Sequence, residues 1–238
     1  MSRSASDRLF CLGLLVFLDW AFPATAQEAT TAARSASGPV SNVATARKLV
    51  KYGIESRSPE ALVVAAEILL EQPVLRRARN KVEKRRGQTS SDGVPRPSDH
   101  DILVTRYSPA AIAEQAREMA FGDPLATRLV ERLEAKLLDR SRGRAGGIWM
   151  HCDRIEPNRV HRYEIDFMGA ELAEIWVEGD GSTDLDCYVF NRGGSVIDSR
   201  TDHFDTCLLA WRPDEKEGFA IEIENLGGSP NEYCLLTN

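Results

Sequence analysis

From Trp149 to residue 238, apolar and polar residues alternate, which is the period of a β-strand and not of a helix. Residues 162–167, 185–189 and 219–224 show the pattern most clearly, and glycine-rich turns separate such stretches. Short alternating strands joined by glycine turns pack as two facing sheets, because each strand turns one side inward. We therefore predict an antiparallel β-sandwich over residues 147–238.

Residues 42–146 carry apolar residues at helical spacing instead. Ser58-Pro59-Glu60 and Asp123-Pro124 each place a capping residue and a proline at the start of a helix. With the apolar stripes around them, these signals predict two helical hairpins. The predicted fold class is thus α+β in two units, with N-terminal helical hairpins and a C-terminal antiparallel β-sandwich.

The two predicted units carry opposite net charge. Residues 27–146 contain 21 basic and 15 acidic residues, whereas residues 147–238 contain 7 basic and 19 acidic ones. Several basic residues form a run from Arg76 to Arg86, within a Pro-containing linker predicted at about 76–107. We interpret this run as the solvated end of the preceding helix. Contact with the protein's own acidic domain or with a membrane surface is the alternative.

The first 26 residues have the layout of a secretory signal peptide. Two arginines precede an apolar run, and Ala24-Thr25-Ala26 forms an A-x-A cleavage site. A transmembrane anchor is the alternative, but the run is shorter than the roughly 20 apolar residues of a span, and Asp19 interrupts it. Residues 27–41 lack apolar periodicity and are predicted to be flexible. We expect a periplasmic or secreted protein without a transmembrane segment after signal cleavage.

Four cysteines remain once the predicted signal peptide is removed: Cys152, Cys187, Cys207 and Cys234. An even number of cysteines in an exported chain indicates two disulfides, and no C-x-x-C pair favours a metal site instead. Four cysteines allow three pairings, between which the sequence does not decide. We favour Cys187–Cys207 with Cys152–Cys234, because the second pair would tie the start of the domain to its last strand. A nucleophilic role for Cys152, which follows His151, is disfavoured by the same argument.

Three stretches of the predicted sandwich resemble the pre-peptidase C-terminal domain family of bacteria. Residues 179–190, Gly-Asp-Gly-Ser-Thr-Asp-Leu-Asp-Cys-Tyr-Val-Phe, are similar to its D-x-D-L-Y-V strand, and residues 218–225 to its G-x-Y-x-I-x-V-x-N strand. The closing Tyr233-Cys234-Leu235 matches its terminal Y-x-L. The resemblance covers about residues 150–238.

This resemblance implies a jelly-roll-like domain that ends secreted proteins, often peptidases, and acts in secretion or in binding of matrix or polysaccharide. The chain departs from the family in two ways. No peptidase domain precedes the sandwich, so peptidase activity is not implied. Cysteines replace apolar residues in the strands, which suggests a variant held by disulfides.

Calcium is a ligand that the resemblance implies, since some members of the family bind it. Asp180, Asp184 and Asp186 are closely spaced around a turn and the start of a strand, and Asp202 and Asp205 in a later loop would add oxygen ligands. We predict these five aspartates as a calcium site. The alternative is that aspartate simply favours turns and exposed faces.

Aromatic residues suggest a second kind of site. Trp176, Tyr188, Phe190 and Trp211 would form a platform for sugar rings or a protein partner if they lie on an exposed sheet face. Otherwise they fill the core. No G-x-S-x-G, H-E-x-x-H or P-loop pattern occurs, so the sequence does not favour an enzyme.

These features favour an exported, non-catalytic binding or accessory protein whose partner is an envelope protein or a polysaccharide. A nucleic-acid partner is disfavoured, because the exported chain is acidic, with a net charge of -6. Two alternatives stay open. One is a secreted hydrolase that uses the clustered acids in unrecognised chemistry. The other is an envelope factor whose helical repeats bind another protein.

Overall fold

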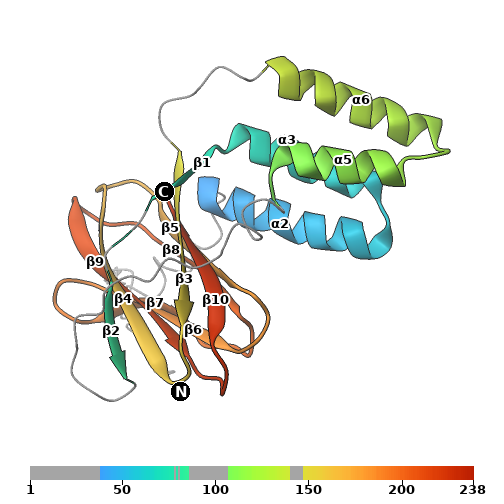
Figure 1. Ribbon diagram of the computed structural model, residues 1–238. Helices are drawn as coiled ribbons and strands as arrows, with labels where there is room; N and C mark the ends of the chain where they lie inside the picture. The colour runs from blue at the N-terminus through green and yellow to red at the C-terminus, as the bar shows by residue number, and fades with distance from the viewer. Residues whose placement is uncertain (1–37, 78, 80, 86–106, 140–146) are drawn as a thin grey trace, which may run out of the picture.

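The structure is a computed structural model that describes residues 38–77, 79, 81–85, 107–139 and 147–238 (Figure 1). Four helices and ten strands lie within these residues. A helical unit is followed by a two-sheet sandwich, which confirms the predicted α+β class. The predicted signal peptide lies outside the described residues, as does most of the predicted flexible segment.

The helices of the helical unit begin where the sequence places capping residues. Ser58, Ser108 and Asp123 accept hydrogen bonds from the backbone N–H groups of the first helical turn, and a proline follows each of them. Helix α2 begins at Pro39, so the prediction that residues 27–41 are flexible is wrong for their last three residues. The helices are α2 (Pro39–Ser56), α3 (Pro59–Glu71), α5 (Pro109–Met119) and α6 (Pro124–Asp139).

The sandwich has the strand order of a jelly roll, with one strand added at an edge of each sheet. Sheet A has the order β1-β3-β10-β5-β8, and sheet B has the order β2-β4-β9-β6-β7. Strands β3 to β6 and β7 to β10 alternate between the sheets, with β6 and β7 paired within sheet B, as in a double Greek key, which confirms the prediction. The strands are β1 (Val74–Arg76), β2 (Val82–Arg85), β3 (Ile148–Ile155), β4 (Arg159–Phe167), β5 (Ala173–Gly179), β6 (Leu185–Phe190), β7 (Val196–Arg200), β8 (Thr206–Trp211), β9 (Glu217–Asn225) and β10 (Asn231–Thr237).

The alternating apolar residues meet between the two sheets. Tyr163 and Ile221 of sheet B and Ile175 and Leu235 of sheet A are all fully buried there. The residues between them in each strand face outward, because successive side chains of a strand point to opposite faces. The period seen in the sequence is therefore the inward face of each strand.

The helical unit covers the outer face of sheet A. Helix α2 contacts β5, α3 packs on α2, and α5 and α6 pack on α3, so the helices extend away from the sheet on one side (Figure 1). Three side chains of sheet A point to this side and pack in the helical core: Met150, Trp176 and Leu236. Every residue of β5 is consequently buried, which is typical of a strand covered on both faces.

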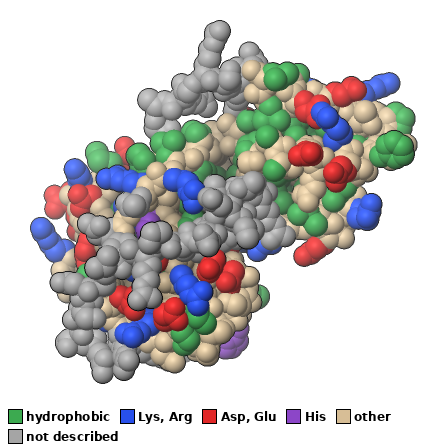
Figure 2. Space-filling view, viewed as in Figure 1, with side chains coloured by type: hydrophobic (Ala, Val, Ile, Leu, Met, Phe, Trp, Pro, Cys, Tyr) green, Lys and Arg blue, Asp and Glu red, His purple; other side chains and the backbone are tan. Residues whose placement is uncertain are grey.

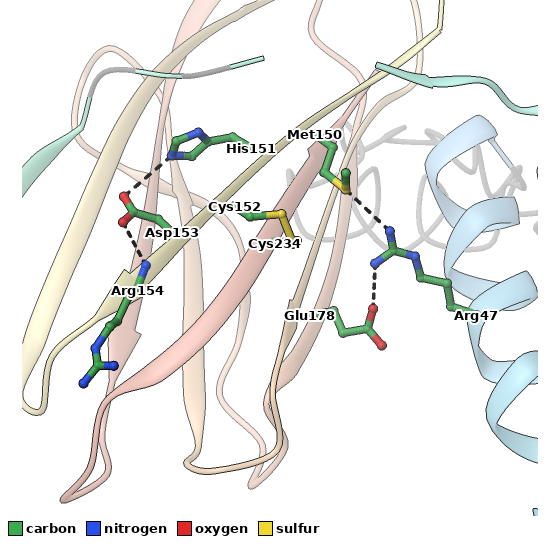
Figure 3. The surroundings of a disulfide bond; sticks show 8 residues. All are labelled: Arg47, Met150, His151, Cys152, Asp153, Arg154, Glu178 and Cys234. Atoms are coloured by element: carbon green, nitrogen blue, oxygen red, sulfur yellow. Dashed lines mark hydrogen bonds and ion pairs between the residues drawn. A yellow bond between two sulfur atoms is a disulfide. The ribbon is translucent and has the colours of Figure 1, made fainter. Parts of the chain in front are cut away.

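An ion pair is buried where α2 meets sheet A. Arg47 Nη1 lies 2.8 Å from Glu178 Oε2, and the two side chains are 4% and 3% exposed (Figure 3). The guanidinium carbon lies 4.4 Å from the ring centroid of Tyr107 and 5.1 Å from that of Trp176. This contact joins the basic helical unit to the acidic sandwich.

The basic run crosses an edge of the sandwich. Strand β1 pairs with β3 in sheet A, and β2 pairs with β4 in sheet B, so the chain passes from one sheet to the other between them. We call the described residues of 74–85 the strap. The prediction that this run is the solvated end of a helix is wrong, because the open sheet edges offer N–H and C=O groups that the strap satisfies. The alternative, contact with the protein's own acidic domain, is confirmed.

Candidate functional site

Both favoured disulfides are present. Cys152 on β3 bonds to Cys234 on β10, which is its register partner within sheet A. Cys187 on β6 bonds to Cys207 on β8, so this disulfide joins the two sheets through the core. None of these four cysteines is a free thiol, which leaves no nucleophile or thiolate ligand among them.

The five aspartates predicted to bind calcium do not converge. Asp180 is held in its turn by two backbone N–H groups, and Asp202 pairs with an arginine two residues before it. Across the described residues, which include Asp184, Asp186 and Asp205, no three histidine, cysteine or acidic side chains gather as a metal site. Calcium binding stays a prediction, and the geometry supplies no converging ligand set for it.

The four aromatics predicted to form a platform divide into two pairs. Trp176 packs in the helical core and Trp211 in the sandwich core, and both are buried. The platform prediction is therefore wrong for the two tryptophans, whose large apolar rings fill the interior instead. Tyr188 and Phe190 lie on the outer face of sheet B, half-buried, with ring centroids 6.2 Å apart.

Acidic side chains lie on the same side of sheet B as this aromatic pair. We call the set Glu164, Asp166, Tyr188, Phe190 and Glu222 the aromatic face. Its members share one side because they occupy alternate positions of β4, β6 and β9, and register partners in neighbouring strands point the same way. In Figure 1 the helical unit lies on the side of sheet A, whereas sheet B is on the far side of the sandwich.

Arginine and lysine side chains organise the centre of the aromatic face. Arg162 donates hydrogen bonds to Glu164 at 2.9 Å and to Glu222 at 3.0 Å. Its guanidinium carbon lies 5.9 Å from the ring centroid of Phe190, within the range of a cation–π contact. Lys84 of the strap lies 2.6 Å from Glu222. Hydrogen bonds to both glutamates raise the pKa of Arg162 against the opposing effect of burial.

Comparison with known proteins identifies no family. No known family matches the sequence, and no curated protein matches it. The sandwich resembles the pre-peptidase C-terminal domain of a collagenase from Bacillus anthracis at a TM-score of 0.34 and 8% identity, over 37% of this chain and 87% of that one. It also resembles PliG, a periplasmic inhibitor of g-type lysozyme from Aeromonas hydrophila, at a TM-score of 0.31 and 12% identity, over 41% and 90%. Both TM-scores are low, so neither similarity indicates a family or a function for this protein.

A second group of polar side chains lies beneath the strap, between the sheets. Lys81 Nζ lies 2.6 Å from Asp153 Oδ2, and the two side chains are 3% and 2% exposed. Nζ also lies 3.1 Å from Nε2 of His161, whose Nδ1 is 2.8 Å from the Tyr233 hydroxyl. The hydroxyls of Tyr163 and Tyr233 share a further hydrogen bond. We call these five residues the strap cluster.

Burial determines the protonation states in the strap cluster. Desolvation lowers the pKa of His161 to about 3, and the charge of Lys81 acts in the same direction. Desolvation also raises the pKa of Tyr163 and of Tyr233. At neutral pH the imidazole is uncharged and both tyrosines keep their protons. The perturbed groups are thus closed off from solvent and do not line a cleft.

Acid is expected to destabilise the protein through His161. The folded imidazole, with a pKa of about 3, stays neutral, whereas the unfolded one takes up a proton below about pH 6.5. The stabilisation is fully present above pH 6.5 and falls by about 1.4 kcal/mol for each pH unit between 6.5 and 3. Denaturant unfolding at pH 7 and at pH 4.5 measures this loss. His161→Gln should flatten the dependence, and the exposed His203→Gln should preserve it; equal slopes in both variants would contradict the assignment.

A modest hollow lies in the helical unit. A groove of about 230 Å³ lies between α5 and α6, and its lining includes the ion-paired Arg117 and Glu134 together with Val130. It lies within the second hairpin and not between the two hairpins. Among the described helices, none combines the length and apolar character needed to cross a bilayer.

Proposed function

We propose that the protein is an exported, non-catalytic accessory protein that binds a cationic segment of another envelope protein through the aromatic face. The observation that carries this proposal is the contrast between the two sheets. Sheet A is covered by the helical unit, whereas sheet B carries a stacked aromatic pair and acidic side chains on its outer side. Aromatic rings and an arginine among polar side chains are typical of protein–protein recognition surfaces.

Charge supports a cationic partner. Besides the three acids of the aromatic face, Asp186 and Glu224 lie on the same side of sheet B as direct register partners. Among the described residues of this face, Glu164 and Asp166 are exposed, whereas Asp186, Glu222 and Glu224 are at most 9% exposed, so the first two would meet a cationic ligand. Complementary charge across an interface therefore favours a cationic partner for this face. Arginine suits this surface because its guanidinium both stacks on aromatic rings and pairs with carboxylates.

The strap cluster supports a role in binding and not in catalysis. Groups whose pKa is strongly shifted mark active sites when they line a cleft. Here Asp153, His161, Tyr163 and Tyr233 have such shifts, and each of them is buried beneath the strap. The hydrolase alternative needs two carboxyls that face a common substrate, one of them with a raised pKa. The strap cluster has a single carboxyl, Asp153, and its pKa is lowered.

Binding to a designed peptide tests the proposal. A peptide in which arginine alternates with leucine serves as the probe, and NMR chemical shifts of the mature protein locate it. We expect perturbations around Tyr188 and Phe190, and about tenfold weaker binding by a variant that carries both Tyr188→Ala and Phe190→Ala. Affinity should also fall as salt rises.

A matched control comes from the helical unit. Replacement of Phe121 and Leu125 by alanine removes two exposed apolar side chains far along the chain from sheet B, and should leave peptide affinity unchanged. Perturbations confined to the helices, or equal affinity of the aromatic-face variant and the unaltered protein, would rule out the proposed surface. Preferential binding of a neutral oligosaccharide would instead favour a polysaccharide ligand.

The turn between α5 and α6 supports a second candidate function, the helical interaction factor. Phe121 is 95% exposed and Leu125 is 72% exposed, and both lie at this turn. Figure 2 shows hydrophobic side chains among charged ones at the surface of the helical unit. The peptide experiment distinguishes the two candidates, because each variant removes one surface and retains the other.

A further inference from the structure

The ion pair between Lys81 and Asp153 differs from the surface ion pairs of the protein. Its nitrogen and oxygen are 2.6 Å apart, and both side chains are almost completely buried. Lys84 and Glu222 are equally close, but their side chains are 25% and 12% exposed. Taking two charges out of water is costly, and one attractive contact recovers only part of that cost. A reaction that replaced these two buried charges with a neutral group would therefore be favoured.

Two histidines flank the buried pair. His161 is fully buried, and its Nε2 lies 3.1 Å from Lys81 Nζ. His151 Nε2 lies 3.6 Å from Asp153 Oδ2, the oxygen that faces the lysine. Figure 3 shows His151 and Asp153 side by side on the face of β3 that points away from helix α2. One imidazole thus lies at the amine and the other at the carboxylate oxygen.

We propose that Lys81 and Asp153 condense to an intramolecular amide, an isopeptide bond that fastens the strap to β3. The amine nitrogen attacks Asp153 Cγ, a C–N bond forms, and the bond from Cγ to Oδ2 breaks. Of the three protons on the ammonium group, one stays on the amide nitrogen and two leave with Oδ2 as water. An ammonium and a carboxylate thus give an amide and one water, without oxidant, reductant or other co-reactant.

The neighbouring groups fit the proton transfers of this step. Asp153 Oδ2, which lies 2.6 Å from Nζ, takes a proton from the Lys81 ammonium, and this frees the nitrogen lone pair for attack. A second proton passes from the attacking nitrogen to Oδ2, which then leaves as water, while His161 and His151 hold the amine and the carboxyl group in place. The strands hold the reacting atoms in contact, and such fixed geometry replaces a bimolecular encounter with an effectively unimolecular one. The surrounding tyrosines and sheets exclude water, which opposes hydrolysis of the amide.

The resting pair is ionised before the reaction. Burial acts to raise the pKa of Asp153, but the interaction with His151 and the charge of Lys81 outweigh it and lower the pKa to about 2. The carboxylate is therefore the starting species, and proton transfer within the cluster precedes attack. Condensation then removes both buried charges together.

The amide bond would stabilise the strap, whose two strands are short and form few backbone hydrogen bonds. Strand β1 has three residues and β2 has four, so the ladder alone holds the strap weakly at both sheet edges. The two disulfides cross-link β3 to β10 and β6 to β8, and neither reaches the strap. An amide from Lys81 to Asp153 would close this edge covalently. The inference is independent of the function proposed for the aromatic face.

Intact mass spectrometry of the mature protein, reduced and denatured, tests the bond. We expect a mass lower than that of the linear chain by one water, about 18 Da, and a branched tryptic peptide that joins Lys81 to Asp153. Lys81→Arg and Asp153→Ala should restore the full mass. Lys84→Arg is the matched control and should keep the deficit. His161→Gln should leave a measurable fraction of the chain at full mass.

Loss of water can also arise at Asp-Gly sequences by succinimide formation, and Asp180-Gly181 is one such sequence. Mild alkali opens a succinimide and restores the mass, whereas the amide withstands it. The unaltered protein decides the question whether or not the variants fold. A full-length mass in the unaltered protein, or a deficit that alkali reverses, would overturn the proposal and leave Lys81 and Asp153 as an ion pair.

Discussion

Replacement of both Cys152 and Cys234 by alanine is expected to lower the free energy of unfolding by about 4 to 5 kcal/mol. The two residues are 82 apart in sequence, so their disulfide closes a long loop in the unfolded chain. Breaking a long loop returns more conformational entropy to the unfolded state than breaking a short one. Denaturant unfolding at neutral pH, with and without the double substitution, measures the difference.

The second disulfide provides the control. Cys187 and Cys207 are 20 apart, and the same reasoning gives a loss of about 3 kcal/mol when both become alanine. Both positions lie in the sandwich core, so alanine also leaves a small void there. If this variant proved the less stable of the two, core packing and not loop length would govern the disulfide contribution.

The strands of the sandwich could be predicted because each has an inward face that the sequence displays directly. Tyr163, Ile221 and Leu235 are apolar residues between polar neighbours, and each is buried between the sheets. The alternation placed Cys152 in the first strand and Cys234 in the last, which favoured their pairing although the sequence left all three pairings open. Local alternation therefore carried most of the fold.

The strap escaped prediction because its partners lie far away in the sequence. Its charges were interpreted as a solvated helix end, yet Arg77, Arg79, Lys81 and Glu83 occupy alternate positions, which is the period of a strand. Lys81 pairs with Asp153, 72 residues later, and nothing local indicates that the lysine is buried. An alternation of charged residues next to a strand-forming valine, Val82, was the available signal.

The candidate site was predicted only in part, for a related reason. Alternation shows which side chains of a strand share a face, but it does not tell whether the outward face is exposed to solvent or covered by another element. Trp176 stands at an outward position of β5 and would be exposed on a two-layer sandwich, but helix α2 covers it. Tyr188 and Phe190 have the same spacing on β6, and their rings lie together on the outer side of sheet B. Placement of the helical unit decided between these outcomes.

Replacement of Arg47 by alanine is expected to lower the free energy of unfolding by about 3 to 5 kcal/mol. The substitution leaves Glu178 buried without the guanidinium that now lies 2.8 Å from it, and it removes the cation packed between Tyr107 and Trp176. Lys51 Nζ lies 3.2 Å from the other oxygen of Glu178 but is 46% exposed, so it offsets only part of the loss. Denaturant unfolding followed by near-UV circular dichroism measures both stability and the packing of the tryptophan.

Two further variants separate the buried charge from the rest of the contact. Arg47→Met together with Glu178→Leu removes both charges and retains apolar volume, so its stability should lie within about 1 kcal/mol of the unaltered protein or above it. Arg154→Ala breaks an exposed pair with Glu156 and should cost less than about 1 kcal/mol. If the double variant were as unstable as Arg47→Ala alone, the unpaired carboxylate of Glu178 would not explain the loss of stability. The stacking of Arg47 on the two aromatic rings would then be what holds helix α2 on sheet A.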